Sequence, residues 1–147
     1  MNIFKSASIS NYDPERLQPM RDELVNLGVK ELRTPEEVEQ ALLHTTGRTM
    51  VVVNSVCGCA GAAARPAIAL ALESAKRPAN CFTVFAGQDK EATARTREIF
   101  GDIEPSSPSI AFLVNGKVEG FIHRTDIQGH TPEEVAAKLI AIFEAHV

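Results

Sequence analysis

Residues 106–124 of this 147-residue chain read SSPSIAFLVNGKVEGFIHR. The Asn-Gly pair at 115–116 is a strong signal for a two-residue turn, because a type I′ turn needs positive φ at both central positions. The apolar runs on either side predict two antiparallel strands, at 109–114 and 117–123. Pro108 directly precedes the first strand, a position where a proline is tolerated. The sequence therefore predicts a β-hairpin near the C-terminus.

Strands and helices alternate upstream of this hairpin. The continuous apolar run at 49–54 predicts a central strand that is buried on both faces of the sheet. Residues 81–86 predict another strand, and 29–32 a short edge strand. Helices are expected between the strands and after the hairpin, from Asp13-Pro14 to Gly28, from Thr34-Pro35 to near Gly47, from Gly61 to Lys76, from Asp89 to Phe100, and from Thr131-Pro132 through Phe143.

The starts of these helices carry recognisable capping chemistry. Thr-Pro-Glu-Glu occurs at 34–37 and again at 131–134, and we interpret both as capping boxes, not as an internal repeat. Asp89 is adequately explained as the N-cap of the helix that follows it. Pro66 lies inside the alanine-rich run and is expected to bend that helix, because it removes a hydrogen bond.

Length and charge narrow the class of protein. A chain of this size predicts one domain, residues 1–147, with a single core. The net charge of −4 and the absence of a polybasic run argue against binding to nucleic acid or to an anionic membrane. The N-terminus lacks a long apolar segment, and no window approaches a membrane span. We therefore expect a cytoplasmic protein.

The stretch 55–67, SVCGCAGAAARPA, places Cys57 and Cys59 one residue apart at the junction between the central strand and a helix. The pair could be a redox site, half of a metal site, or two inert core residues. At a strand-to-helix junction, unpaired backbone N–H groups and the helix dipole favour thiolate over thiol. We therefore expect Cys57 to be acidified and reactive, which favours the redox interpretation.

A metal site is the main competitor, because two thiolates suit zinc or copper(I). A tetrahedral zinc site needs two further ligands. The remaining cysteine and the four histidines do not occur in a paired spacing that would supply them. Cys81 opens a strand and is interpreted as a buried core residue. We therefore expect no bound metal. His123 and Arg124 lie at the end of the last strand and could approach a substrate. The four histidines are scattered, at His44, His123, His130 and His146.

The whole order of elements is that of a thioredoxin fold with one extra N-terminal helix: an α/β protein with a central mixed β-sheet flanked by helices. The segment 106–124 resembles the thioredoxin segment in which a cis-proline precedes a strand and an Asn-Gly turn leads to the edge strand. Together with VVVN before the CGC motif and VFAGQDKEAT at 84–93, it resembles the bacilliredoxin family of thiol-disulfide proteins over nearly the whole chain.

This resemblance implies a thiol-disulfide oxidoreductase that removes a low-molecular-weight thiol, such as bacillithiol, from client proteins. Cys57 would be the attacking thiol and Cys59 the resolving one, with the substrate bound at Gly58, Ser107 and Pro108. Pro108 would be cis. The client proteins and the small thiol are the expected partners, and no other cofactor is expected. Two alternatives stay open: an isomerase acting on protein disulfides, and a Cys-x-Cys protein that binds zinc or copper.

The motif departs from thioredoxin in ways that affect mechanism. Val56 stands where thioredoxin has a tryptophan, and the strand at 49–54 contains no carboxylate to relay protons. The single residue between the cysteines closes a tighter ring than Cys-x-x-Cys, so their disulfide is expected to be strained and easily reduced. Gly58 would supply the unusual backbone angles of that ring, although it is also compatible with a simple turn.

Overall fold

The computed structural model of the protein describes residues 13–147. Residues 1–12, which belong to the expected domain 1–147 and to the N-terminal stretch that lacks an apolar segment, lie outside the described residues. Among residues 13–147, no helix is both long enough and apolar enough to cross a membrane. In chain order the elements are helix α2 (Pro14–Val25), strand β1 (Lys30–Glu31), helix α3 (Pro35–His44), strand β2 (Arg48–Asn54), π-helix η1 (Ala60–Ala64), helix α4 (Arg65–Ala71), strand β3 (Asn80–Phe85), helix α5 (Lys90–Phe100), strands β4 (Ser109–Val114) and β5 (Lys117–Ile122), and helices α6 (Arg124–Ile127) and α7 (Pro132–Ala145).

The strands form one mixed sheet in the order β1-β3-β2-β4-β5. β1, β2 and β3 are parallel, whereas β4 is antiparallel to β2 and β5 to β4. Every residue of β2 after Arg48 is buried, so the apolar run does form the central strand. At the hairpin, Asn115 and Gly116 have φ values of 51° and 84°, as the predicted turn requires. The α/β fold class is confirmed.

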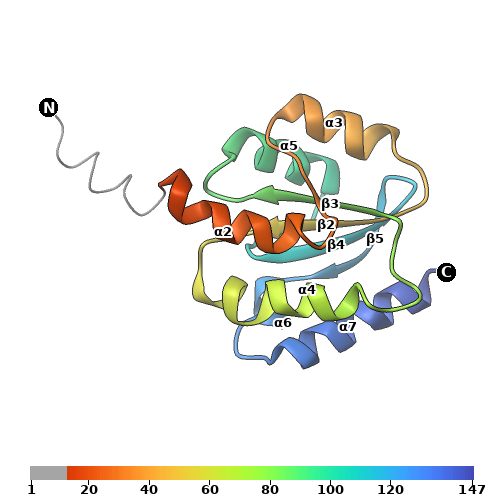
Figure 1. Cartoon of the computed structure of the whole chain (residues 1–147). Coiled ribbons are helices and arrows are strands. Elements are labelled where there is room, and N and C mark those ends of the chain that lie inside the picture. Colours follow the sequence, from red (N-terminus) through yellow and green to blue (C-terminus); the bar gives the residue numbers. More distant parts are fainter. Residues whose placement is uncertain (1–12) are drawn as a thin grey trace, which may run out of the picture.

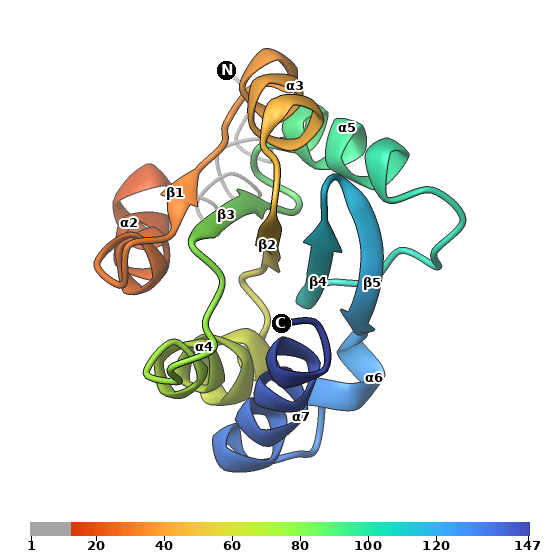
Figure 2. The same ribbon diagram turned by 90° about the vertical axis from the view of Figure 1, so that its right-hand side faces the viewer.

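Helices cover both faces of the sheet (Figure 1, Figure 2). Successive side chains of a strand point to opposite faces, so β2 contributes to two cores. Val51 and Val53 pack in the cluster under α3 and α5. Met50 and Val52 pack in the cluster under α4 and α7, which also contains Phe143. The extra N-terminal helix, α2, lies along the edge of the sheet at β1 and contacts α4.

The alanine-rich run differs from the single bent helix expected between 61 and 76. The chain forms the π-helix η1 first, and Pro66 then falls in the first turn of α4. A proline has no N–H to donate and its ring collides with the carbonyl four residues earlier, but the first turn of a helix tolerates it. α4 ends at Ala71, earlier than expected, and Arg77 Nη1 donates to the carbonyl of Leu72 at 3.1 Å.

Asp89 does occupy the N-cap position of α5, as the sequence predicts, but its side chain does not cap the helix. α5 begins directly after Asp89, but the carboxylate makes no hydrogen bond to the helix N–H groups. It accepts hydrogen bonds from Nη1 and Nη2 of Arg21 at 2.8 and 3.2 Å. Arg21 is only 5% exposed and also pairs with Glu31. A buried guanidinium needs counter-charges, and this tertiary requirement overrides the local cap.

Candidate active site

Cys57 and Cys59 lie in the loop that leaves the C-terminal end of β2 and enters η1 (Figure 1). Both are half-buried free thiols, so neither is sealed in the core. In α/β sheets, ligands bind outside the carboxyl ends of the parallel strands. The two cysteines therefore stand where this class of fold places its sites, as the sequence predicts.

The backbone around Cys57 forms the start of a helix. Gly58 and Cys59 are already helical, and the N–H of Ala60 donates to the carbonyl of Cys57 at 3.1 Å. Cys57 therefore directly precedes the first helical residue, where backbone N–H groups remain free to face a sulfur. The φ of Gly58 lies outside the left-handed region, and a Cβ at this position would meet nothing within 4 Å. The unusual angles expected of Gly58 are therefore not needed in the thiol form.

The two sulfurs are in direct contact and differ in acidity. Their Sγ atoms are 3.0 Å apart. Burial tends to raise the pKa of Cys57, but hydrogen bonds from the Cys59 thiol, the Ser55 hydroxyl and the N–H groups of Ala60 and Cys59 outweigh it, so this pKa is lowered. Burial, the hydrogen bond to Cys57 and the charge of Cys57 raise the pKa of Cys59. Of the two sulfurs, Cys57 is therefore the one that loses its proton more easily, and Cys59 is the one that keeps its proton as a hydrogen-bond donor.

The predicted cis-proline lies beside this loop. The Ser107-Pro108 peptide bond is cis, as the sequence predicts. Ser109 pairs with Val53 in the register of β4 against β2, so Pro108 falls opposite the end of β2, from which the cysteine loop departs. The sequence-predicted residues Gly58, Ser107 and Pro108 are thus on the two loops that flank the same edge of the sheet.

Arg124 is the charged residue that the sequence left undecided. It opens α6, a short helix that the sequence did not predict. Its Nη1 donates to the carbonyl of Ser107 at 3.4 Å, and its backbone N–H donates to Oγ of Ser106 at 3.2 Å. Its charge opposes the rise in the pKa of Cys59. β5 is parallel to β2, so the residue after β5 falls on the same edge of the sheet, and that topology was the available signal.

Replacing Arg124 by glutamine is expected to raise the pKa of Cys59 further, because a positive charge that favours its thiolate is lost. The measurement is the rate of Cys59 alkylation against pH in the Cys57→Ser protein, with peptide mass spectrometry to identify the site. Arg95→Gln on α5 is the matched control, since Arg95 pairs with Glu39 instead. An equal change in both proteins, or none in Arg124→Gln, would contradict the assignment.

The other candidate residues lie elsewhere. Cys81 is buried, its register partner is Met50 near the start of β2, and its Sγ contacts the carbonyl of Pro78 at 3.5 Å. Burial raises the pKa of Cys81. It is therefore a core residue at the far end of the strands, as interpreted from the sequence. Across residues 13–147, no group of three or more His, Cys, Asp and Glu side chains is arranged to hold a metal ion.

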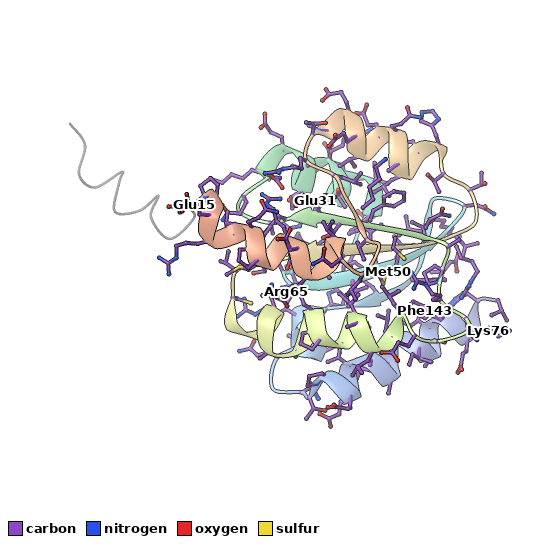
Figure 3. The ribbon with its side chains drawn as sticks, in the orientation of Figure 1. Glu15, Glu31, Met50, Arg65, Lys76 and Phe143 are labelled. Atoms are coloured by element: carbon purple, nitrogen blue, oxygen red, sulfur yellow. The ribbon has the colours of Figure 1, made fainter. Side chains whose placement is uncertain are left out.

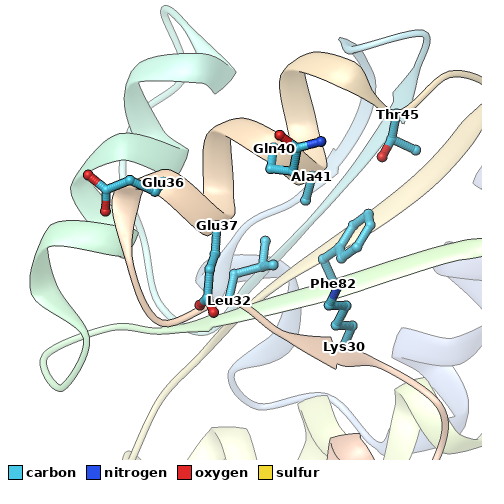
Figure 4. A pocket seen from close by; sticks show the side chains of 8 residues that line it. All are labelled: Lys30, Leu32, Glu36, Glu37, Gln40, Ala41, Thr45 and Phe82. Atoms are coloured by element: carbon cyan, nitrogen blue, oxygen red, sulfur yellow. The ribbon is translucent and has the colours of Figure 1, made fainter.

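A cavity of about 450 Å³ lies between β1, β3 and α3 (Figure 4). Leu32, Ala41 and Phe82 supply its apolar lining, with Lys30 and Gln40 among the polar residues around it. None of its lining residues comes from the cysteine loop or the Pro108 loop. The thiol site is therefore separate from this cavity.

Similar proteins share both the sequence and the fold. A family model described as Disulphide isomerase matches residues 12–147. A bacilliredoxin of Geobacillus kaustophilus is 51% identical over 142 residues, covering 96% of this chain and 98% of the relative. A bacilliredoxin of Bacillus thuringiensis is 55% identical over 124 residues, covering 84% and 85%. Among solved structures, a thioredoxin of Malassezia sympodialis gives a TM-score of 0.54 at 15% identity, covering 80% of this chain and 90% of that one. This last likeness concerns the fold alone, and it confirms the predicted thioredoxin-like architecture.

Proposed function

The chain belongs to the bacilliredoxin family of thiol-disulfide oxidoreductases, and from this premise we propose that it reduces mixed disulfides between client proteins and a low-molecular-weight thiol such as bacillithiol. The observation that carries the proposal is the contact between Cys57 and Cys59 at 3.0 Å, with opposite changes in pKa. A nucleophilic thiolate beside a protonated thiol is the arrangement that two successive thiol exchanges require.

In the first exchange, the Cys57 thiolate attacks the sulfur of the small thiol in the mixed disulfide. A disulfide forms between Cys57 and the small thiol, and the original sulfur–sulfur bond breaks. The client cysteine leaves as a thiolate and takes up a proton from solvent. The low pKa of Cys57 supplies the thiolate, and its half-buried position leaves the sulfur accessible to a protein-bound substrate.

In the second exchange, Cys59 loses its proton and attacks Sγ of Cys57. A disulfide forms between the two cysteines, and the small thiol leaves as a thiolate. Once Cys57 carries no negative charge, two of the causes that raise the pKa of Cys59 are gone, so its deprotonation becomes easier after the first exchange. The oxidised protein returns to the dithiol by reaction with two further molecules of the small thiol, which leave as their own disulfide.

Substrate contacts are proposed at Gly58, Ser107 and Pro108, because these residues flank the sulfurs on two adjacent loops. The small thiol is a co-substrate, and the reaction uses no other cofactor. We place the reaction in the cytoplasm, where a reducing environment keeps both cysteines available as thiols. Isomerisation of protein disulfides is the second candidate function, favoured by the description of the family model that the chain matches.

The test compares substrates at equal concentration. Client proteins with one exposed cysteine are loaded with bacillithiol or with glutathione, and a third substrate carries scrambled internal disulfides. Intact-mass measurement monitors release of the small thiol from the loaded clients. Recovery of the folded state monitors repair of the protein with scrambled disulfides. We expect the bacillithiol-loaded client to be cleared fastest. Faster repair of the scrambled substrate would establish the isomerase instead, and equal clearance of glutathione would remove the preference for bacillithiol.

A further inference from the structure

Arg65 carries a positive charge in the interior, directly behind the cysteine loop. It is 6% exposed and lies between α2 and the start of α4 (Figure 3). Its Nε is 3.2 Å from a carboxylate oxygen of Glu23, but no hydrogen bond satisfies that Nε within residues 13–147. A buried arginine with an imperfect ion pair is expensive, and apolar residues of similar volume often serve stability as well or better. A buried arginine that is incompletely paired therefore points to a task other than packing.

The guanidinium is bound to the two residues that precede the cysteine loop. Nη1 of Arg65 donates to Oδ1 of Asn54 and to the carbonyl of Ser55, both at 3.0 Å. Oδ1 of Asn54 also accepts the N–H of Ser55 at 2.9 Å. Asn54 and Ser55 are themselves 3% and 8% exposed, so these acceptors have no access to bulk water. Arg65 therefore fixes the turn by which the chain leaves β2.

That turn holds the attacking cysteine in place. Oγ of Ser55 accepts the N–H of Cys57 at 3.1 Å. With its hydroxyl held there, the Ser55 side chain is one of the groups that lower the pKa of Cys57. A continuous set of hydrogen bonds thus runs from Arg65 through Ser55 to Cys57. The chain is adapted to it, because a Cβ on Gly61 would lie 3.0 Å from Nη2 of Arg65.

We propose that Arg65 is a positioning residue for the thiol exchange, which holds the Asn54-Ser55 turn so that the Ser55 hydroxyl remains on Cys57. The proposal rests on the proposed function, in which Cys57 is the attacking thiol. Arg65 touches neither sulfur and acts through Ser55. Its planar fork serves two acceptors at fixed geometry, which a lysine ammonium does not reproduce.

The other charged groups around the site come from three elements. Cys59 lies on the same loop, Arg124 approaches from α6, and Glu23 on α2 faces Arg65. Replacing Arg65 leaves residue 59 and Arg124 in place. Arg65→Lys also keeps the positive charge, so a change in the titration of Cys57 in that variant reports the position of Ser55, and Glu23→Gln in the same protein separates any contribution of the freed Glu23.

The experiment measures alkylation of Cys57 against pH by peptide mass spectrometry in the Cys59→Ser background. We expect Arg65→Met and Arg65→Lys to raise the apparent pKa of Cys57 by about one unit, so that alkylation near neutral pH slows about tenfold and recovers at high pH. Arg21→Met is the matched control, because Arg21 is an equally buried, ion-paired arginine whose hydrogen bonds go to Glu31 and Asp89 instead of Asn54 and Ser55. It should lose stability and leave the titration of Cys57 unchanged.

A double-mutant comparison makes the proposed route explicit. Ser55→Ala alone should raise the pKa of Cys57 as Arg65→Met does, and the double variant should raise it no further, because both changes remove the same hydrogen bond. If Arg65→Met does not fold, Gly61→Ala is the substitute, because its added Cβ crowds the guanidinium of Arg65. It should also raise the pKa of Cys57, but by less. Additive effects of Ser55 and Arg65, an unchanged titration, or an equal change in Arg21→Met would overturn the proposal. These titrations do not depend on which substrate is cleared. Failure of the proposed function can therefore be distinguished from failure of the proposed role of Arg65.

Discussion

The Cys57→Ser protein is expected to show no clearance of a mixed disulfide above the uncatalysed exchange. Cys57 is the thiol with the lowered pKa, and a serine hydroxyl does not ionise near neutral pH to replace the thiolate. Loss of a covalent nucleophile lowers the rate of an enzyme by up to about 10⁶-fold. Cys59 does not substitute for it, because its pKa is raised and it lacks the hydrogen bond from Ser55. Release of the small thiol from a loaded client, followed by intact mass, measures the loss.

Cys81→Ala is the control for this loss, since it removes a thiol of the same chain from the far end of the strands. It should clear the mixed disulfide at the rate of the unaltered protein, with a modest fall in stability from the small cavity. Retained clearance by Cys57→Ser would show that Cys59 is the attacking thiol. Loss of clearance in Cys81→Ala would instead implicate a cysteine that the structure buries in the core.

Most of the fold was accessible from local signals. The run at 49–54 is apolar on both faces because it forms the central strand, and the Asn-Gly pair at 115–116 marks the hairpin because few other residues accept both positive φ values. The capping box at 131–134 is likewise complete: Thr131 and Glu134 exchange hydrogen bonds at 2.8 and 3.1 Å. At 34–37 only half of the predicted box forms, because the Glu37 side chain accepts the N–H of Arg33 instead of that of Thr34. Each of these signals depends on residues adjacent in sequence.

The elements that were missed depend on distant residues. Asp89 is used by the buried Arg21 and not by its own helix, and no local pattern announces that pairing. α6 is a single short turn whose first residue is fixed by Ser106, from another loop. Arg65 lies in an alanine-rich run, and the local pattern there predicts a solvent-exposed arginine. Its burial follows only when Asn54, Ser55 and Glu23 are brought together.

At the candidate site, too, the local features could be predicted from the sequence and the contacts between side chains could not. The order of Cys57 and Cys59 at a strand-to-helix junction was sufficient to predict an acidified first cysteine, because free N–H groups at a helix start are a local property. Exposure does not separate the two roles, since both cysteines are half-buried residues. The difference in acidity between the two cysteines comes from Ser55, which of these two is hydrogen-bonded to Cys57, and from the direct contact between the sulfurs. Neither could be predicted from the spacing.

Cys59→Ser is expected to accept the small thiol and then stop, with a stable adduct on Cys57 approaching one per molecule. The first exchange needs only the Cys57 thiolate and releases the client. A serine at 59 still donates a hydrogen bond toward Cys57, so the pKa of Cys57 should remain below its ordinary value. The second exchange needs a sulfur within reach of Sγ of Cys57, and Cys59 is the sulfur in contact with it.

Intact mass and peptide mapping of Cys59→Ser, after exposure to a loaded client without free small thiol, locate the adduct. Cys57 should carry it, and added small thiol should remove it by direct exchange, because the sulfur of Cys57 remains half-exposed. Cys57→Ser treated in the same way should remain unmodified. If the adduct instead accumulates on Cys59 in Cys57→Ser, the roles are reversed: Cys59 attacks the mixed disulfide, and the hydrogen bonds from Ser55 and Ala60 to Cys57 then favour the thiolate that resolves the adduct.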